Sequence, residues 1–261
     1  MATTISTGQT ASTLPQKKGD PPNLGTVKSG RALAFDGVVD YLTLSIGTKP
    51  LNNVTVACWI NSTFASTWDT ILGHADGFGD YIWFQVKADG TIACALNGID
   101  GGGAYGDFIS ASSTTIVADT WQRVVMTYDS TSGGVIYVDG VSVATTSSIG
   151  AIDDDAGNLQ IGKSGSSDYH FGGNMSDWQL WDATWTATDV TNDYTHPEML
   201  AHTFSGTSLA STNLKAWYPM TEGNPESPQT TIFDGSGNKN HATSVFYGDE
   251  LITADKDVNM L

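Results

Sequence analysis

Three glycine-rich loops carry oxygen-bearing side chains of the kind that bind a hard cation. Calcium takes carboxylate and amide oxygens together with backbone carbonyls, which flexible glycine-containing loops supply. The candidate ligands are Asp76 and Asp80 in DGFGD, Asp168 in SGSSD, and Asp234 and Asn238 in DGSGNKN. We therefore expect Ca²⁺ as the candidate cofactor. The third loop equally suits a series of Asx turns that satisfies its own backbone, so that alternative stays open.

Aromatic residues in loops are a second set of candidates. A sugar ring can stack on the face of an exposed aromatic side chain. The aromatic positions in loops are Trp68, Phe78, Tyr105 and Tyr169, which we predict as ligand-binding residues. Other tryptophans lie within apolar strand-like runs and are expected to pack in the core: Trp59, Trp83, Trp121, Trp178 and Trp181.

Catalytic groups are scarce in this sequence. Glutamate does not occur before Glu198, and we find no pair of aspartates with the spacing that acid/base catalysis on one strand needs. A nucleophile elbow of the form G-x-S-x-G is absent, as is a closely spaced His or Cys pair for zinc. We predict that the protein is not an enzyme, with a glycoside hydrolase as the least favoured alternative.

The elements that must position these residues are short strands. Apolar runs rich in Val, Ile, Thr, Trp and Tyr are separated by Gly, Asp or Asn, which is the pattern of strands and turns. The predicted strands cover residues 31–35, 40–46, 53–62, 69–75, 80–87, 91–97, 106–110, 121–129, 134–139, 141–146, 158–162, 171–182 and 214–220. In TWQRVVMTYD, large residues occupy both faces, which predicts a strand covered on both sides and hence a two-layer structure.

Local signals add one helix and two hairpins. Thr186 followed three residues later by Asp189 resembles a capping box, which predicts a short helix near 186–196. The hairpins are YIWFQV-KADG-TIACAL and GGVIYV-DG-VSVATT, and Asp139-Gly140 supplies the positive φ angles of a tight turn in the second. Cys58 and Cys94 lie in apolar runs and are expected to be buried free thiols.

Composition limits the partners. The 28 acidic residues against 11 Lys and Arg argue against nucleic acid and anionic membranes. No segment is long and apolar enough to insert in a membrane. Residues 1–28 are rich in Thr, Ser, Gly and Pro and are predicted to be a flexible N-terminal arm, followed by one domain at 29–246 and a C-terminal tail at 247–261.

Six ordered segments carry a family resemblance. They are ALAFDGVVDYLTL, VTVACWIN, ILGHADGFGDYIWFQVKADGTIACAL, TWQRVVMTYDSTSGGVIYVDGVSV, LQIGKSGSSDYHFGGNMSDWQLWDATWTATDV, and LKAWYPMTEG with FDGSGNKNHATSV. Their order and spacing resemble the laminin-G-like jelly rolls of the concanavalin-A-like superfamily, to which the pentraxins are related. The resemblance implies an all-β, two-sheet jelly-roll sandwich.

The resemblance also bears on the sites. It places loops 76–80 and 164–168 where pentraxins carry calcium-binding acids, although the acidic cluster of the second loop is reduced here to Asp168. Glucanases of the superfamily use paired glutamates on one strand. No such pair exists before Glu198, so the resemblance implies binding without catalysis.

Three functions remain open on the sequence alone. The first is a virion component, such as a phage capsid-decoration or tail-associated protein. It would be made in the cytoplasm, displayed on the particle surface, held to other virion or surface proteins by the N-terminal arm, and able to bind cell-surface glycans. The second is a bacterial extracellular carbohydrate-binding or adhesion module. The third is the glycoside hydrolase.

Overall fold

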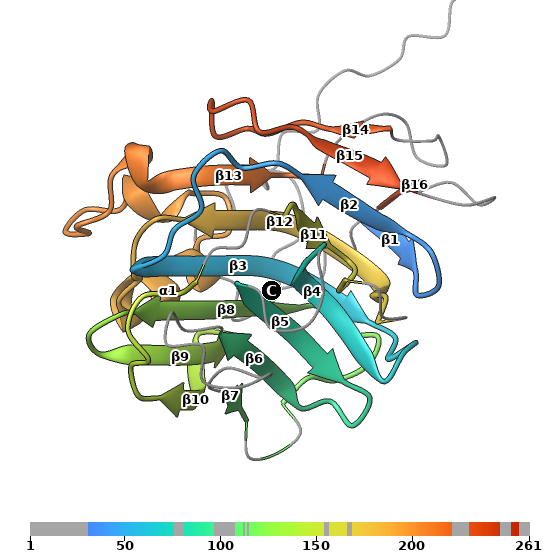
Figure 1. Ribbon diagram of the computed structural model, residues 1–261, viewed down its shortest axis with the longest axis horizontal. Helices are drawn as coiled ribbons and strands as arrows, with labels where there is room; N and C mark the ends of the chain where they lie inside the picture. The colour runs from blue at the N-terminus through green and yellow to red at the C-terminus, as the bar shows by residue number, and fades with distance from the viewer. Residues whose placement is uncertain are drawn as a thin grey trace, which may run out of the picture.

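The structure is a computed structural model in which residues 31–75, 81–96, 108–111, 113, 115–153, 157–165, 169–220, 230–245 and 252–255 are described. Two antiparallel sheets of eight strands each lie face to face (Figure 1). Within the described ranges, no helix has the length and apolar character needed to cross a membrane. The predicted all-β, two-sheet jelly-roll sandwich is confirmed.

Sheet A has the strand order β10-β9-β8-β3-β12-β1-β16, with β13 paired to the second half of β12. Its strands are β1 (Arg31–Asp36), β3 (Asn53–Ser62), β8 (Gln122–Asp129), β9 (Gly133–Val138), β10 (Val141–Thr146), β12 (Gly172–Trp181), β13 (Leu214–Tyr218) and β16 (Ile252–Asp255). The long central strands β3, β8 and β12 are buried along almost their whole length, as expected of strands covered on two faces.

Sheet B has the strand order β14-β15-β2-β11-β4-β5-β6-β7. Its strands are β2 (Tyr41–Leu44), β4 (Trp68–His74), β5 (Ile82–Lys87), β6 (Ile92–Leu96), β7 (Phe108–Ser110), β11 (Leu159–Ile161), β14 (Thr231–Ile232) and β15 (Ala242–Val245). In Figure 1 strands β4, β5 and β6 lie in front of β3 and β8, and their direction is oblique to that of the strands behind.

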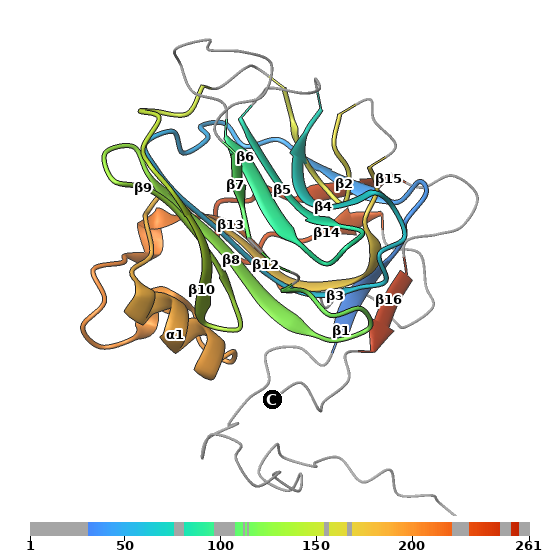
Figure 2. The same ribbon diagram turned by 90° about the horizontal axis from the view of Figure 1, so that it is seen from below.

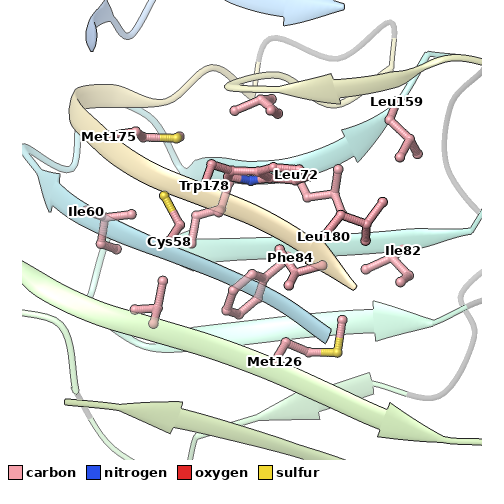
Figure 3. Packing of buried hydrophobic residues seen from close by; sticks show 14 of the residues in the cluster. Cys58, Ile60, Leu72, Ile82, Phe84, Met126, Leu159, Met175, Trp178 and Leu180 are labelled. Atoms are coloured by element: carbon pink, nitrogen blue, oxygen red, sulfur yellow. The ribbon is translucent and has the colours of Figure 1, made fainter. Parts of the chain in front are cut away.

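The main core lies between the two sheets. Figure 3 shows Cys58, Ile60 and Met126 of sheet A in the same buried cluster as Leu72 and Phe84 of sheet B. These side chains come from alternate positions of their strands, because successive residues of a strand point to opposite faces. Both described cysteines are buried free thiols, as predicted.

A second, smaller core covers the opposite face of sheet A. Helix α1 (Ala187–Thr195) and the 3₁₀ turns η2 (Ala201–Thr203) and η3 (Ser211–Asn213) follow β12. Figure 2 shows α1 lying beside β8 and β10, on the side of sheet A that faces away from sheet B. The side chains of this core are Ala57, Val125, Tyr137, Trp181, Trp185, Val190, Ala201, Leu209 and Leu214. Sheet A is therefore covered on both faces, as the pattern of TWQRVVMTYD predicts.

A buried ion-pair network anchors α1 to the sheet. Arg123 on β8 binds Asp193 of α1 through Nε (2.7 Å) and Nη2 (3.0 Å), and its Nη1 lies 3.2 Å from Asp177 on β12. Asp177 has a φ of 51° within an irregular stretch of β12, and its other oxygen accepts a hydrogen bond from Trp217 Nε1. The guanidinium charge is thus fully compensated in the interior, which burial requires.

The local predictions hold. Thr186 caps α1, with its side chain accepting from the backbone of Asp189 and the Asp189 carboxylate accepting from the backbone of Thr186. In the β9–β10 hairpin Asp139 and Gly140 have φ angles of 50° and 80°, as the tight turn demands. All thirteen predicted strands are present within one or two residues of their predicted bounds.

The sequence prediction is incomplete at the C-terminal end. Residues 252–255, placed in the predicted tail, form β16 and pair with β1. The segment ITAD is too short to show a strand pattern, and its pairing depends on the otherwise open edge of β1. Strands β14 and β15 were missed for the same reason, since they have two and four residues. The predicted N-terminal arm lies outside the described residues.

Candidate ligand-binding face of sheet B

The face of sheet B that points away from sheet A carries the candidate site. Because Ile82, Phe84 and Val86 of β5 point into the core, the intervening residues Trp83, Gln85 and Lys87 point outward. The same alternation and the strand register place other side chains on this outer face. They are Tyr41, Thr43, Trp68, Thr70, Ala93, Ala95 and Gln160. We call this surface the outer face of sheet B.

At one end of the outer face, Trp68 and Lys87 form a pair. They are direct cross-strand neighbours on β4 and β5, and the Lys87 Nζ lies 5.1 Å from the centre of the Trp68 ring. Both side chains are half-buried. A cation held against an aromatic ring at this distance is attracted by the ring's quadrupole. The pair therefore offers an apolar surface and a positive charge side by side.

The backbone of Tyr169 is tied to β4 by a short chain of hydrogen bonds. Gln85 Nε2 donates to Thr70 Oγ1 (2.9 Å), and Thr70 Oγ1 donates to the backbone carbonyl of Tyr169 (2.8 Å). Thr70 and Gln85 are buried, whereas Tyr169 is half-buried. Because Trp68 and Thr70 are two residues apart on one face of β4, the structure brings Trp68 and the Tyr169 backbone to the same region.

The middle of the outer face is crossed by residues 163–165. A Cβ atom added to Gly73 would lie 2.4 Å from the carbonyl oxygen of Lys163, so this segment packs directly on β4. The Gly165 N–H donates to the carbonyl of His74 (2.9 Å). Lys163 Nζ lies 4.6 Å from the centre of the Tyr41 ring. A second pair of lysine and aromatic ring thus lies on this face.

Two buried polar atoms stand out in the part of the chain that the structure describes. Gln160 Oε1 and Ser164 Oγ have no hydrogen-bond partner there, although the two residues are only 7% and 0% exposed. Gln160 is opposite Thr43 and Gly73 in the register, so it belongs to the outer face. Buried polar atoms normally have partners, so an unpartnered acceptor indicates a place for a hydroxyl donor from water or ligand.

Of the four predicted ligand-binding aromatics, Trp68 and Tyr169 are described and lie on this face, while Phe78 and Tyr105 fall outside the described residues. Sequence reasoning missed Gln85, Lys87 and Gln160. The signal for Gln85 and Lys87 was available in IWFQVK, where Trp, Gln and Lys alternate with core residues. That alternation predicts an outward-facing row, but it does not say which loop lies over it.

Of the predicted calcium ligands, too, only some are among the described residues. Asp76, Asp80 and Asp168 lie outside the described residues, and Asp234 and Asn238 are in the loop after β14. Asp234 Oδ1 accepts from the backbone of Trp217 (3.0 Å) and Ser236 (2.8 Å). Asp234 Oδ2 accepts from Ser236 Oγ (2.8 Å) and from the backbone of Asn240 (2.9 Å).

Asn238 has an equally local role. Its Nδ2 donates to the carbonyl oxygens of Leu214 (2.7 Å) and Lys215 (3.1 Å) on β13. Together with the four donors on Asp234, this pattern matches the self-satisfied series of Asx turns. Across the described ranges, His, Cys, Asp and Glu residues form no group of three or more that could hold a metal ion. Calcium binding by the chain stays a prediction.

The two packed sheets and their strand order define a concanavalin A-like jelly roll. The chain belongs to the concanavalin A-like lectin/glucanases superfamily, since a laminin-G-type family model with that description matches residues 35–191. No curated protein matches the chain.

A solved structure with a TM-score above 0.5 agrees on the fold. A protein from Bacteroides ovatus, provisionally described as carbohydrate-binding, superposes with a TM-score of 0.60 at 16% sequence identity, over 87% of this chain and 60% of that one. This chain therefore spans less than two thirds of the length of that relative. A heptameric SAP-like pentraxin from Limulus polyphemus gives a TM-score of 0.47 at 20% identity, over 63% of this chain and 81% of that one. The CBM40 of the Ruminococcus gnavus IT-sialidase, bound to α2,3-sialyllactose, gives 0.47 at 15% identity, over 54% and 81%.

Proposed function

We propose that this protein is a non-catalytic, lectin-like module that binds carbohydrate on the outer face of sheet B. The observation that carries the proposal is the Trp68–Lys87 pair on β4 and β5, two residues from Thr70, which holds the backbone of Tyr169. A sugar offers apolar C–H faces and hydroxyl groups, so its binding surface combines aromatic rings with a few well-placed polar groups. The outer face of sheet B has both.

The hydrogen-bond chain below these aromatics supports the proposal. Gln85 and Thr70 are buried and fix the Tyr169 backbone on this face before a ligand arrives. A preorganised surface loses less conformational entropy on binding. The description of the Bacteroides ovatus relative as carbohydrate-binding agrees with this function.

A glycan array followed by calorimetry on the best ligand tests the proposal. We expect the full chain to bind, and Trp68→Ala to weaken binding by at least about tenfold, which corresponds to about 1.4 kcal/mol. Trp121→Ala is the matched control, because that half-buried indole precedes β8 in the other sheet. Equal losses for both variants, or no binding to any glycan, would reject the outer face as a carbohydrate site.

The absence of catalysis is part of the proposal. It rests on the lack of glutamate before Glu198, which leaves the strands of both sheets up to β12 without the paired glutamates of the related glucanases. Incubation with a panel of β-glucans tests it by the release of reducing ends. If the protein, purified to homogeneity, still hydrolyses a β-glucan, it is an enzyme.

The location of the module, on a virion or outside a bacterial cell, stays a prediction. A virion component and an extracellular carbohydrate-binding or adhesion module both suit a glycan-binding surface. The two differ in whether the protein co-purifies with particles in a fixed ratio. If it is a virion component held by its arm, removal of residues 1–28 abolishes incorporation and leaves the domain folded. If the truncated chain is still incorporated into particles, the predicted role of the arm is wrong.

A further inference from the structure

A second aromatic pair lies on the outer face of sheet B, far from Trp68. Strands β14 and β15 are at one edge of sheet B, and β5, β6 and β7 are at the other (Figure 1). Ile232 and Ala242 are opposite each other in the register and belong to the core. The next pair, Phe233 and His241, therefore points outward. Their ring centres are 5.3 Å apart in an edge-on contact.

Phe233 differs from other described residues in its exposure. It is 57% exposed, and within the described ranges the other large hydrophobic residues with such exposure are three valines: Val38, Val117 and Val141. An aromatic ring carries more apolar area than a valine side chain. A ligand that covers Phe233 would therefore remove a larger apolar surface from water.

His241 adds a directed hydrogen-bond donor to this pair. The backbone N–H of Asp234 donates to His241 Nδ1 (3.1 Å), which uses the lone pair of that nitrogen. The proton of the neutral imidazole is then on Nε2. The exposed His241 ring can therefore donate to a hydroxyl of a ligand that contacts Phe233.

A row of hydroxyl groups lies next to the aromatic pair. The register joins Thr231 on β14 to Thr243 on β15 and then to Thr43 on β2. Each threonine adjoins a core residue of its own strand, so its side chain points outward. Thr231 and Thr243 are exposed, and Thr43 is half-buried. We call these three residues the hydroxyl row.

Gln160 on β11 continues the row. It is opposite Thr43, and its Oε1 has no hydrogen-bond partner in the described part of the chain although the residue is only 7% exposed. Cross-strand neighbours have Cβ atoms about 5 Å apart, so a hydroxyl group that contacts Thr43 is also within reach of Gln160. This unsatisfied acceptor is an independent indication of a polar ligand.

The repeat of the row suits a linear polysaccharide. Neighbouring strands are about 4.8 Å apart, which is close to the length of one sugar residue in an extended glycan. A glycan that crosses the strands can therefore place one residue over each threonine. Its hydroxyl groups would meet the hydroxyl row, and the apolar face of one sugar ring would contact Phe233.

We propose that Phe233, His241 and the hydroxyl row form a second carbohydrate subsite, which binds a linear polysaccharide laid across the strands. This inference rests on the proposed carbohydrate-binding function and extends it from one region of the outer face to two. Strand β14 is four strands from β4, which carries Trp68, or about 19 Å across the sheet. A trisaccharide therefore occupies one subsite at a time, whereas a long chain can contact both.

Comparison of short and long ligands tests the inference with the full chain. The probes are soluble glucomannan, xylan, mixed-linkage β-glucan and pullulan, each with its trisaccharide. For at least one of them, we expect an NMR titration with the trisaccharide to change chemical shifts in two separate regions, one at Trp68 and one at Phe233 and Thr43. The polymer should bind with a Kd at least about tenfold lower, because two linked contacts raise the effective concentration of the second.

Variants locate the second subsite. We expect Phe233→Ala to lose the shift changes at the hydroxyl row, to keep those at Trp68, and to lower the gain of the polymer over the trisaccharide by at least about tenfold. Thr43→Val removes a hydroxyl group and keeps the shape, and it should weaken the second region several-fold. The control is Val141→Ala, an equally exposed apolar residue at the edge of sheet A, which should behave as the wild type. Circular dichroism checks that each variant is folded.

The possible results separate the two proposals. If Phe233→Ala keeps both regions of shift change and the full gain of the polymer, the second subsite is wrong and carbohydrate binding beside Trp68 stands. If shift changes occur only at Phe233 and the hydroxyl row, the second subsite holds and the location beside Trp68 fails. If the protein binds none of these ligands and no member of a glycan array, both proposals fail.

Discussion

Arg123 on β8 and Asp193 on α1 form a buried ion pair with two hydrogen bonds, of 2.7 and 3.0 Å. Burial lowers the pKa of Arg123, but the charges of Asp193 and Asp177 outweigh burial and raise it above its usual value. The guanidinium therefore stays charged within the second core. This pair is a direct polar link between the helix and the sheet.

Removing one partner of this pair should be costly. We expect Asp193→Asn to lower the free energy of unfolding by about 3 kcal/mol, because it leaves a buried guanidinium undercompensated. Urea unfolding followed by tryptophan fluorescence measures the change. Lys215→Ala provides the control, since the Lys215–Asp182 pair is 27% and 44% exposed and should contribute less than about 1 kcal/mol. Similar losses for both variants would contradict the assigned role of the buried pair.

Asp36 gives a prediction about pH. Burial raises its pKa, but hydrogen bonds from the backbones of Val39, Val38 and Asp40 outweigh burial and bring the pKa below its usual value of 3.8. Because the folded pKa is the lower one, the carboxylate stabilises the fold above pH 3.8, and this contribution is lost as the pH falls through the folded pKa.

The variant Asp36→Asn keeps the acceptor oxygen and removes the charge. We expect it to be less stable than the wild type by at most about 1 kcal/mol near neutral pH, because the carboxylate is largely exposed to solvent. The difference should disappear in strongly acidic solution. Unfolding curves recorded across this pH range provide the test, and a difference that grows on acidification would contradict the argument.

Asp234 should stabilise the fold whether or not calcium is present. Its two oxygens accept four hydrogen bonds, three from within the loop after β14 and one from the backbone of Trp217 on β13. We expect Asp234→Ala to lower stability by about 2 kcal/mol in EDTA as well as in calcium, since several partly buried donors lose their acceptor at once. A loss seen only in calcium would instead make Asp234 a metal ligand.

Calcium binding itself is tested by thermal melting of the wild type. A ligand that binds the native state alone must raise the melting temperature. If Asp76, Asp80 and Asp168 hold Ca²⁺, millimolar calcium raises the midpoint over that in EDTA, and Asp168→Ala removes part of the rise. An unchanged midpoint would dismiss calcium as a cofactor of this chain.

Much of the fold was predictable because its signals are local. The alternation in IWFQVK, the Asp139-Gly140 turn and the Thr186–Asp189 capping box each need only a few consecutive residues. The site was less accessible, because it depends on contacts between distant residues. Thr70 and Tyr169 are 99 positions apart, and no local pattern indicates that one holds the other. The positive φ at Asp177 and the pairing of β16 likewise depend on tertiary partners.

Carbohydrate binding on the outer face of sheet B is the central claim, and an NMR titration of the full chain tests it most directly. With the best glycan from an array, the largest chemical-shift changes should occur at Trp68, Thr70, Gln85, Lys87 and Tyr169. The residues of the second core beside α1 should be unaffected. Changes confined to α1 and the outward face of sheet A, with none on β4 and β5, would contradict the claim.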